Sequence, residues 1–336
     1  MSSNSGETRA KKSEEPTVLR IGGIAVYVYG LDRIGNVSSI KTLNAVYVLH
    51  PRLGDYTYSE ALALAWLDSY YEFSTDNKAP LIAVTFDNRN HGKRVIDPVG
   101  NESWAISSEP NKIYNELHAQ DMCSSIDGSV LDTSLVIDYL PSVLPFKVQS
   151  PIRNVIAGVS LGGHMAWRVA HLLGPDKVYA ILPIIGSPNL SILLLERLYF
   201  QVLHKTPDFD FSPPWQTTVA DNVYHQLVSS SEYGSQVETL LPRPLFNLVS
   251  RQDYELERHF PVPIKVFMLC GRDDPLVPAK YTEKWVASRA LQDHRRPLDL
   301  KLYIQPNTGH VCTPEMTRQA GLWIKSILSS PPSSSL

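Results

Sequence analysis

A serine flanked by glycines is the first candidate for chemistry, in the segment GVSLGGHMAWRVAHLLG, residues 158–174. A serine hydroxyl is a weak nucleophile at neutral pH and needs a base, which an acidic residue orients in turn. The apolar run before Ser160 predicts a buried strand, and the residues from Leu161 onward predict a helix. Gly-x-Ser-x-Gly at such a junction is typical of a sharp turn that presents a nucleophilic serine above a sheet. The alternative is a glycine-rich turn that does no chemistry.

A candidate acid and a candidate base follow this serine along the chain. Asp273 and Asp274 come directly after the apolar run PIKVFMLCG, and His310 follows the apolar run LDLKLYIQP. The carboxyl ends of parallel strands lie at one edge of a sheet, so three separate strand ends can bring a nucleophile, an acid and a base together. We therefore predict that Ser160 is a nucleophile.

These segments resemble those of the α/β-hydrolase superfamily, over roughly residues 20–328. In that family the acid commonly lies in a G-x-x-D-x-x-V-P stretch, which GRDDPLVP (271–278) matches. The resemblance implies that Asp274 is the acid, and it leaves Asp273 as a loop carboxylate or a helix-capping group. The family's histidine usually follows a glycine after the last strand, as His310 does.

The resemblance also implies an oxyanion hole, which needs two backbone N–H donors. One donor is expected from Leu161, the residue after the nucleophile. Relatives often take the second from a His-Gly pair after an earlier strand, whereas this chain has His50–Pro51 there. Proline has no N–H, so Arg52 or Leu53 must donate instead, and Arg52 is the closer match.

A second polar segment, FDNRNHGKR, resembles the family's D-x-R-G-H-G-x-S loop. The resemblance implies that Asp87, Arg89 and His91 hold a loop near the site, with direct catalysis as the alternative. His164 lies one turn into the helix after the serine, where a local hydrogen bond is expected and contact with a substrate is the alternative. No role is predicted for His118.

Predicted strands and helices alternate along most of the chain, which indicates an α/β fold with a mostly parallel sheet and helices on both faces. The exception is the region from about 188 to 260, where prolines, aromatics and helical pieces predict a helical cap insertion or, alternatively, a string of surface helices. We expect one α/β-hydrolase domain over 17–328, between a disordered tail at 1–16 and a flexible tail at 329–336. Strands are predicted within 17–31, 44–51, 79–94, 152–160, 177–186, 263–271 and 298–306, and helices at 58–73, 115–144, from 161, at 279–292 and at 314–329.

Composition narrows the classes of partner and compartment. Of the 336 residues, 43% are hydrophobic, which is enough for a sizeable core. The net charge of −3 and the absence of a long basic run argue against nucleic acid as a partner. The odd and scattered cysteines, and the lack of a signal peptide or an apolar run of about 20 residues, predict a cytoplasmic protein without a membrane span. The final Ser-Ser-Leu partly matches a peroxisomal address, which is the alternative location.

No metal-ligand spacing, phosphate loop or dinucleotide fingerprint is present, so we expect neither a metal nor a cofactor.

The expected function is a serine hydrolase that cleaves a carboxylic ester or thioester, with Ser160 as nucleophile, His310 as base and Asp274 as acid. An acyltransferase, a peptidase and a non-catalytic binding protein on the same scaffold are the alternatives. Aromatic residues in the 188–260 region favour a small acyl substrate with an apolar group, or they form the core of the cap. The oligomeric state stays open.

Overall fold

The computed structural model describes residues 15–72, 79–105, 113–205, 217–292 and 299–329. The tails that the sequence predicts lie outside these ranges except for residues 15, 16 and 329. Among the helices in these ranges, none combines the length and the apolar content that crossing a lipid bilayer requires.

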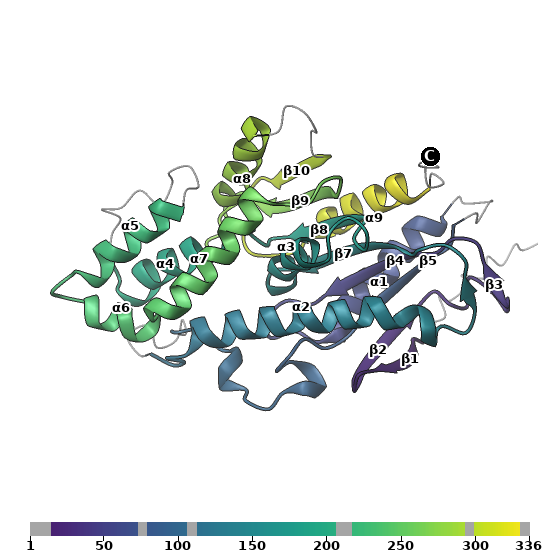
Figure 1. The fold of residues 1–336 in the computed structure, drawn as a ribbon, viewed down its shortest axis with the longest axis horizontal. Coiled ribbons are helices and arrows are strands. Elements are labelled where there is room, and N and C mark those ends of the chain that lie inside the picture. Colours follow the sequence, from purple (N-terminus) through teal and green to yellow (C-terminus); the bar gives the residue numbers. More distant parts are fainter. Residues whose placement is uncertain (1–14, 73–78, 106–112, 206–216, 293–298, 330–336) are drawn as a thin grey trace, which may run out of the picture.

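Within the described residues, eight strands form one sheet in the order β1-β2-β5-β4-β7-β8-β9-β10 (Figure 1). The first two strands form a hairpin and β2 also pairs antiparallel with β5, whereas every other neighbouring pair is parallel. The predicted α/β fold with a mostly parallel sheet is therefore confirmed. The strands are β1 (Thr17–Ile21), β2 (Ile24–Tyr29), β4 (Asn44–Leu49), β5 (Leu81–Thr85), β7 (Arg153–Val159), β8 (Ala180–Ile184), β9 (Lys265–Gly271) and β10 (Leu300–Gln305).

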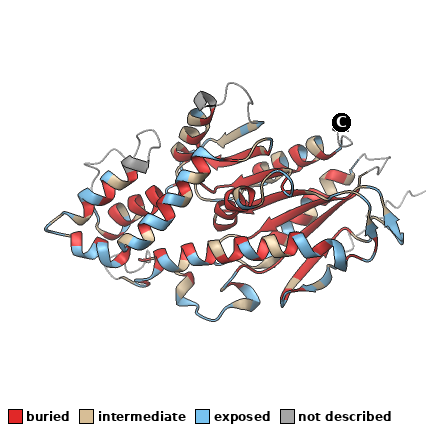
Figure 2. Ribbon diagram, viewed as in Figure 1, coloured by how far each residue is buried: buried red, intermediate tan, exposed pale blue. Residues whose placement is uncertain are grey.

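Two apolar cores cover the two faces of this sheet, and successive residues of one strand belong to different cores. In β4, Tyr47 and Leu49 belong to one core, whereas Val46 and Val48 belong to the other. Central strands buried on both faces need continuous apolar runs, and Figure 2 shows them buried along their length. Helices α2 (His118–Val143), α3 (Leu161–Leu173) and α8 (Ala279–Gln292) contribute to the first core, and α1 (Tyr56–Tyr71) and α9 (Pro314–Leu328) to the second.

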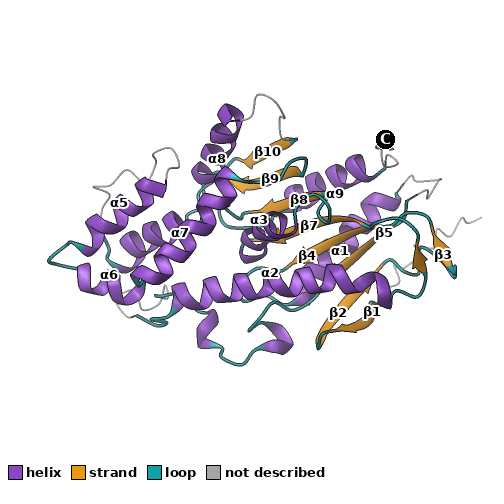
Figure 3. Cartoon of the chain, in the orientation of Figure 1, coloured by secondary structure: helices purple, strands orange, loops and turns teal. Residues whose placement is uncertain are grey.

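A helical insertion joins β8 to β9 and fills most of the region that the sequence singles out at about 188–260. Figure 3 shows its helices grouped together, beyond the strands. It consists of α4 (Ser191–Arg197), a π-helical turn (Leu198–Val202), α5 (Thr217–Val228), α6 (Gly234–Leu240) and α7 (Arg243–Arg258).

A buried ion pair ties the insertion to the helix that follows the candidate nucleophile. Arg168 on α3 donates from Nη2 to Asp253 Oδ1 on α7 at 3.0 Å, and the two side chains are only 7% and 5% exposed. The other oxygen of Asp253 accepts the backbone N–H groups of Leu190 and Ser191 at 2.8 and 2.7 Å. One carboxylate therefore joins α3, α7 and the start of α4.

A further strand pair lies outside the main sheet. The two-residue strands β3 (Ser39–Ile40) and β6 (Lys147–Val148) pair in parallel and were not predicted. A strand of two residues is too short to show an alternation of apolar and polar side chains, so a sequence pattern cannot reveal such short strand pairs.

Candidate active site

Ser160 occupies a sharp turn between the end of β7 and the start of α3. Its φ of 53° and ψ of −108° are unfavourable for a residue with a Cβ atom, and its N–H donates to Ile184 O at 2.9 Å. The glycines two positions before and after Ser160 are required because a Cβ atom would not fit at either position. A Cβ atom on Gly158 would lie 2.2 Å from Gly162 O, and one on Gly162 would lie 2.2 Å from Leu49 O. The turn therefore brings the serine close to the end of β4.

The structure brings Ser160, His310 and Asp274 together in one chain of hydrogen bonds. Ser160 Oγ lies 2.8 Å from His310 Nε2, and His310 Nδ1 lies 2.7 Å from Asp274 Oδ2. A carboxylate can only accept, so Nδ1 carries the imidazole proton and Nε2 is left to accept from the serine hydroxyl. The side chain of His310 is 19% exposed and that of Asp274 is 0% exposed. The histidine can thus reach a substrate, while the carboxylate of Asp274 is shielded from solvent.

The two adjacent aspartates of the loop after β9 have different surroundings. Asp274 Oδ1 accepts the backbone N–H groups of Leu276 and Val277 at 2.8 and 2.9 Å, so both of its oxygens have partners. Asp273 is exposed, and its backbone N–H donates to Thr308 O at 2.9 Å. The carboxylate that contacts the histidine is therefore that of Asp274.

The loop after β4 lies next to the serine and holds the residues expected to bind an oxyanion. Pro51, Arg52 and Leu161 all line the cavity at Ser160. Among the described residues, no acceptor is present for the backbone N–H groups of Leu161 and Arg52. Leu53, the other candidate donor, has a φ of 64° and is exposed. Two N–H groups thus remain available beside the nucleophile.

His50 fixes this loop through its buried ring. Its Nδ1 lies 2.8 Å from Pro51 O, and its Nε2 accepts the backbone N–H of Asn88 at 2.9 Å. Burial lowers the pKa of His50 to about 4, so the ring is neutral and can accept and donate at the same time. The side-chain amide of Asn88 donates back to His50 O at 3.1 Å. The loop is therefore tied to the polar segment after β5.

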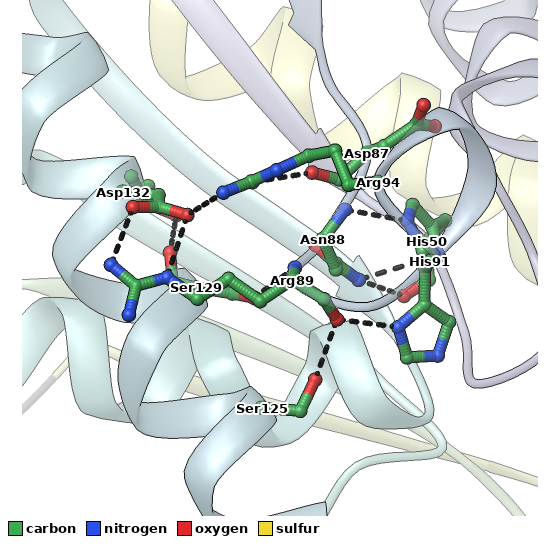
Figure 4. A network of polar contacts seen from close by, with 10 residues as sticks. His50, Asp87, Asn88, Arg89, His91, Arg94, Ser125, Ser129 and Asp132 are labelled. Carbon is green, nitrogen blue, oxygen red and sulfur yellow. Dashed lines mark hydrogen bonds and ion pairs between the residues drawn. The ribbon is translucent and has the colours of Figure 1, made fainter. Parts of the chain in front are cut away.

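That polar segment forms the network in Figure 4. Asp87 accepts the backbone N–H groups of Tyr56 and Lys93 at 2.8 and 2.9 Å, which joins the segment to the start of α1. Arg89 donates two bonds to Asp132 on α2 at 3.0 and 2.9 Å, and the Nδ1 of His91 lies 2.8 Å from the carbonyl of Arg89. None of these side chains is among the residues that line the cavity at Ser160, so the contacts fit a supporting role.

A cavity of about 150 Å³ lies against the serine and the histidine. Its wall includes His164, whose Nδ1 lies 2.8 Å from Ser187 O, and His118, for which the sequence predicted no role. The hydrogen bond of His164 is thus made to a residue 23 positions along the chain and not to its own helix. Burial lowers the pKa of both histidines to about 3, so both are neutral at physiological pH. The remaining lining residues come from the segment before α2, from α2 itself, from the insertion and from the acid loop: Ser103, Trp104, Met122, Arg197, Gln201 and Leu276.

Sequence patterns gave no indication of these lining residues. Arg197 and Gln201 belong to the insertion and reach Ser160 only through the tertiary fold, and Trp104 lies within a stretch for which the sequence predicts neither a strand nor a helix. Within the described ranges, no group of three His, Cys, Asp or Glu side chains is arranged to hold a metal ion.

Comparisons with known proteins agree with this architecture. A family model described as "Alpha/beta hydrolase family" matches residues 49–320. The fold is similar to that of an acetyl xylan esterase from Paenibacillus sp. R4, with a TM-score of 0.54 and 14% identity, covering 93% of this chain and 82% of that one. It is also similar to the esterase Pf2001 from Pyrococcus furiosus, with a TM-score of 0.51 and 14% identity, covering 94% of this chain and 93% of that one. A search of curated protein sequences found no match.

Proposed function

The chain belongs to the alpha/beta hydrolase family, and on that premise we propose that it is a serine hydrolase that cleaves a carboxylic ester or thioester. The observation that carries the proposal is the chain of hydrogen bonds from Ser160 through His310 to the buried Asp274. The strained backbone at the serine and the cavity against it support the same conclusion.

In the proposed mechanism, His310 Nε2 accepts the hydroxyl proton as Ser160 Oγ attacks the substrate carbonyl. The N–H groups of Leu161 and Arg52 donate to the oxyanion that forms. The negative charge of Asp274 stabilises the imidazolium, which then gives its proton to the departing alcohol or thiol. Water next attacks the acyl-enzyme with its proton passing to His310, and collapse of the second oxyanion returns that proton to Ser160.

We also propose that the helices between β8 and β9 act as a cap over this site, within one hydrolase domain spanning 17–328. The support is that Arg197 and Gln201, both from the insertion, line the cavity at the serine.

A reducing compartment such as the cytoplasm is the proposed location, because all three cysteines are free: Cys123, Cys270 and Cys312.

The experiment that tests the function measures release of p-nitrophenol from p-nitrophenyl acetate and butyrate by the purified protein. Ser160→Ala should abolish turnover and leave the far-UV circular dichroism unchanged. Ser142→Ala is the matched control, since that serine is exposed on α2 and its hydroxyl donates to Tyr139 O, three residues earlier on the same helix. Full turnover by Ser160→Ala would contradict the proposal. Adding a short alcohol and analysing the products separates hydrolysis from acyl transfer.

A further inference from the structure

Two guanidinium groups line the cavity beside the nucleophile. Arg52 comes from the loop after β4 and Arg197 from the end of α4. Arg197 donates from Nε and Nη2 to Leu276 O at 3.1 and 2.6 Å. Among the described residues, the one partner of its Nη1 is the sulfur of Met122, at 3.9 Å. Arg52 donates to Asn101 O and to Ser103 Oγ at 2.5 and 2.9 Å. Both guanidinium groups therefore keep N–H donors that the described residues do not use.

Neither arginine forms an ion pair with a described carboxylate. The acidic groups that act on Arg197 through space are Asp274 and Glu196. Asp274 is engaged by His310 and two backbone N–H groups, as described above. Glu196 binds Lys280 Nζ at 2.5 Å and Tyr281 OH at 2.6 Å. Both carboxylates are thus committed to other partners.

Both guanidinium groups carry a positive charge beside the cavity, and no described carboxylate pairs directly with either of them. Burial and, to a smaller extent, the positive charge of Arg52 lower the pKa of Arg197 to about 10, so the side chain is still charged at neutral pH. Glu102 favours the charged form of Arg52 through space but makes no ion pair with it among the described residues. His118 and His164 in the wall are neutral at that pH, because burial lowers their pKa values. The nearby carboxylates act on the two arginines only through space, and a bound anion could accept the N–H groups that the described residues leave unused.

We propose that the substrate carries a carboxylate that binds to Arg52 and Arg197, within a few bonds of the carbonyl that Ser160 attacks. This rests on the proposed function and specifies its substrate class. A guanidinium presents paired N–H groups that match a carboxylate, and such charge-assisted bonds are stronger than neutral ones. The substrate is therefore a short acidic ester or thioester. The sequence favoured a substrate with an apolar group, and Trp104, Met122 and Leu276 are available to contact the methylene carbons of such a group.

The test compares matched pairs of stable esters by pH-stat titration. Monomethyl glutarate against methyl pentanoate places the carboxylate on the acyl side, and acetoxyacetate against propyl acetate places it on the leaving group. For each pair, the readout is kcat/KM of the acidic ester divided by kcat/KM of the neutral ester. This ratio is then divided by the corresponding ratio of the rates of alkaline hydrolysis, which corrects for the different intrinsic reactivity of the two esters. We expect a ratio of about tenfold or more for one pair in the wild type, which equals about 1.4 kcal/mol.

Arginine variants assign that preference to the site. Arg197→Met should reduce the ratio to about one, and Arg197→Lys should restore part of it because it keeps the charge. Arg197 also holds the carbonyl of Leu276, but damage to the acid loop slows both esters of a pair and leaves their ratio unchanged. Arg243→Met is the matched control, since this arginine of the insertion pairs with Asp221 and does not line the cavity.

Each outcome decides the matter. A preference for either acidic ester that Arg197→Met abolishes supports the inference, and the responding pair locates the carboxylate. Equal rates for acidic and neutral esters in both pairs overturn it and leave the hydrolase proposal intact. If Arg197→Met does not fold, Arg52→Met takes its place, because that change keeps the backbone N–H. Failure of the wild type to cleave any ester would refute the proposed function itself.

Discussion

Replacing Asp274 by asparagine changes one oxygen for an NH₂ group in a dry site. The amide oxygen can still accept the N–H groups of Leu276 and Val277, so the loop should keep its shape. The NH₂ group must then face His310 Nδ1, which lies 2.7 Å from the carboxylate in the wild type. A donor there forces the imidazole proton onto Nε2, and the histidine can no longer accept from Ser160.

The size of the effect follows from the charge that is lost. Two unit charges about 4 Å apart attract by about 4 kcal/mol at an effective dielectric constant of about 20. Loss of that stabilisation of the imidazolium slows the reaction about a thousandfold. Because the wrong tautomer adds to this loss, we expect kcat of Asp274→Asn to fall by about 10³- to 10⁴-fold.

The assay is steady-state ester hydrolysis at pH 7.5, together with thermal unfolding of both proteins. Asp273→Asn is the matched control, since Asp273 lies in the same loop and its side chain is exposed. The kcat of this variant should stay within about twofold of the wild-type kcat. A well-folded Asp274→Asn that keeps more than a tenth of the wild-type kcat would refute the assignment of the acid.

Three further predictions concern packing, the insertion and pH. Gly162→Ala places a methyl group 2.2 Å from Leu49 O and should abolish ester hydrolysis or the yield of soluble protein, so full activity would show that the turn is looser than described. Asp253→Ala leaves Arg168 buried without its partner and should lower the free energy of unfolding in urea by about 3–5 kcal/mol, and a loss below 1 kcal/mol would argue against that role. Burial lowers the pKa of His118 to about 3, whereas an unfolded histidine titrates near pH ~6.5, so proton uptake favours the unfolded chain. The free energy of unfolding should therefore fall by up to about 1.4 kcal/mol per pH unit for this group as the pH drops below about 6.5, and an unchanged slope in His118→Gln would contradict this.

The sequence was sufficient to predict the fold and the positions of the catalytic candidates. Each candidate lies directly after an apolar run, and runs buried on both faces predict parallel strands well. Because the carboxyl ends of such strands share one edge, topology predicts that the segments carrying Ser160, Asp274 and His310 approach one another. The choice of Asp274 over its neighbour came from the resemblance to the family's G-x-x-D-x-x-V-P stretch. The glycines around Ser160 were also informative. Gly158 needs space against Gly162 O within the turn, and Gly162 needs space against Leu49 O at the end of β4.

The chemical character of the cavity was less predictable. Arg197 lies far from Ser160 in sequence, and its orientation depends on how the insertion packs against the loop after β9. Nothing in the periodicity of α4 distinguishes an arginine that faces a substrate from one that faces solvent. Aromatic residues in the insertion favoured an apolar substrate, but Tyr224, for example, stacks on Phe246 inside the insertion itself.

The loop after β4 shows how a departure from the family pattern can be accommodated. The proline at 51 has no N–H group to donate. The ring of His50 nevertheless fixes the loop, since its Nδ1 lies within hydrogen-bond distance of Pro51 O and its Nε2 accepts the backbone N–H of Asn88. This arrangement leaves the N–H of Arg52 without an acceptor among the described residues. The sequence indicated the candidate donor but not the contacts that position it.

The most direct measurement of the central claim is labelling with a fluorophosphonate probe, followed by peptide mass spectrometry. Such a probe forms a stable adduct only with a serine that a neighbouring base activates. We predict a single adduct on Ser160 in the wild type and no adduct in Ser160→Ala. A folded wild-type protein that stays unlabelled, with this probe and with a smaller phosphonylating reagent, would contradict the claim that Ser160 is an activated nucleophile.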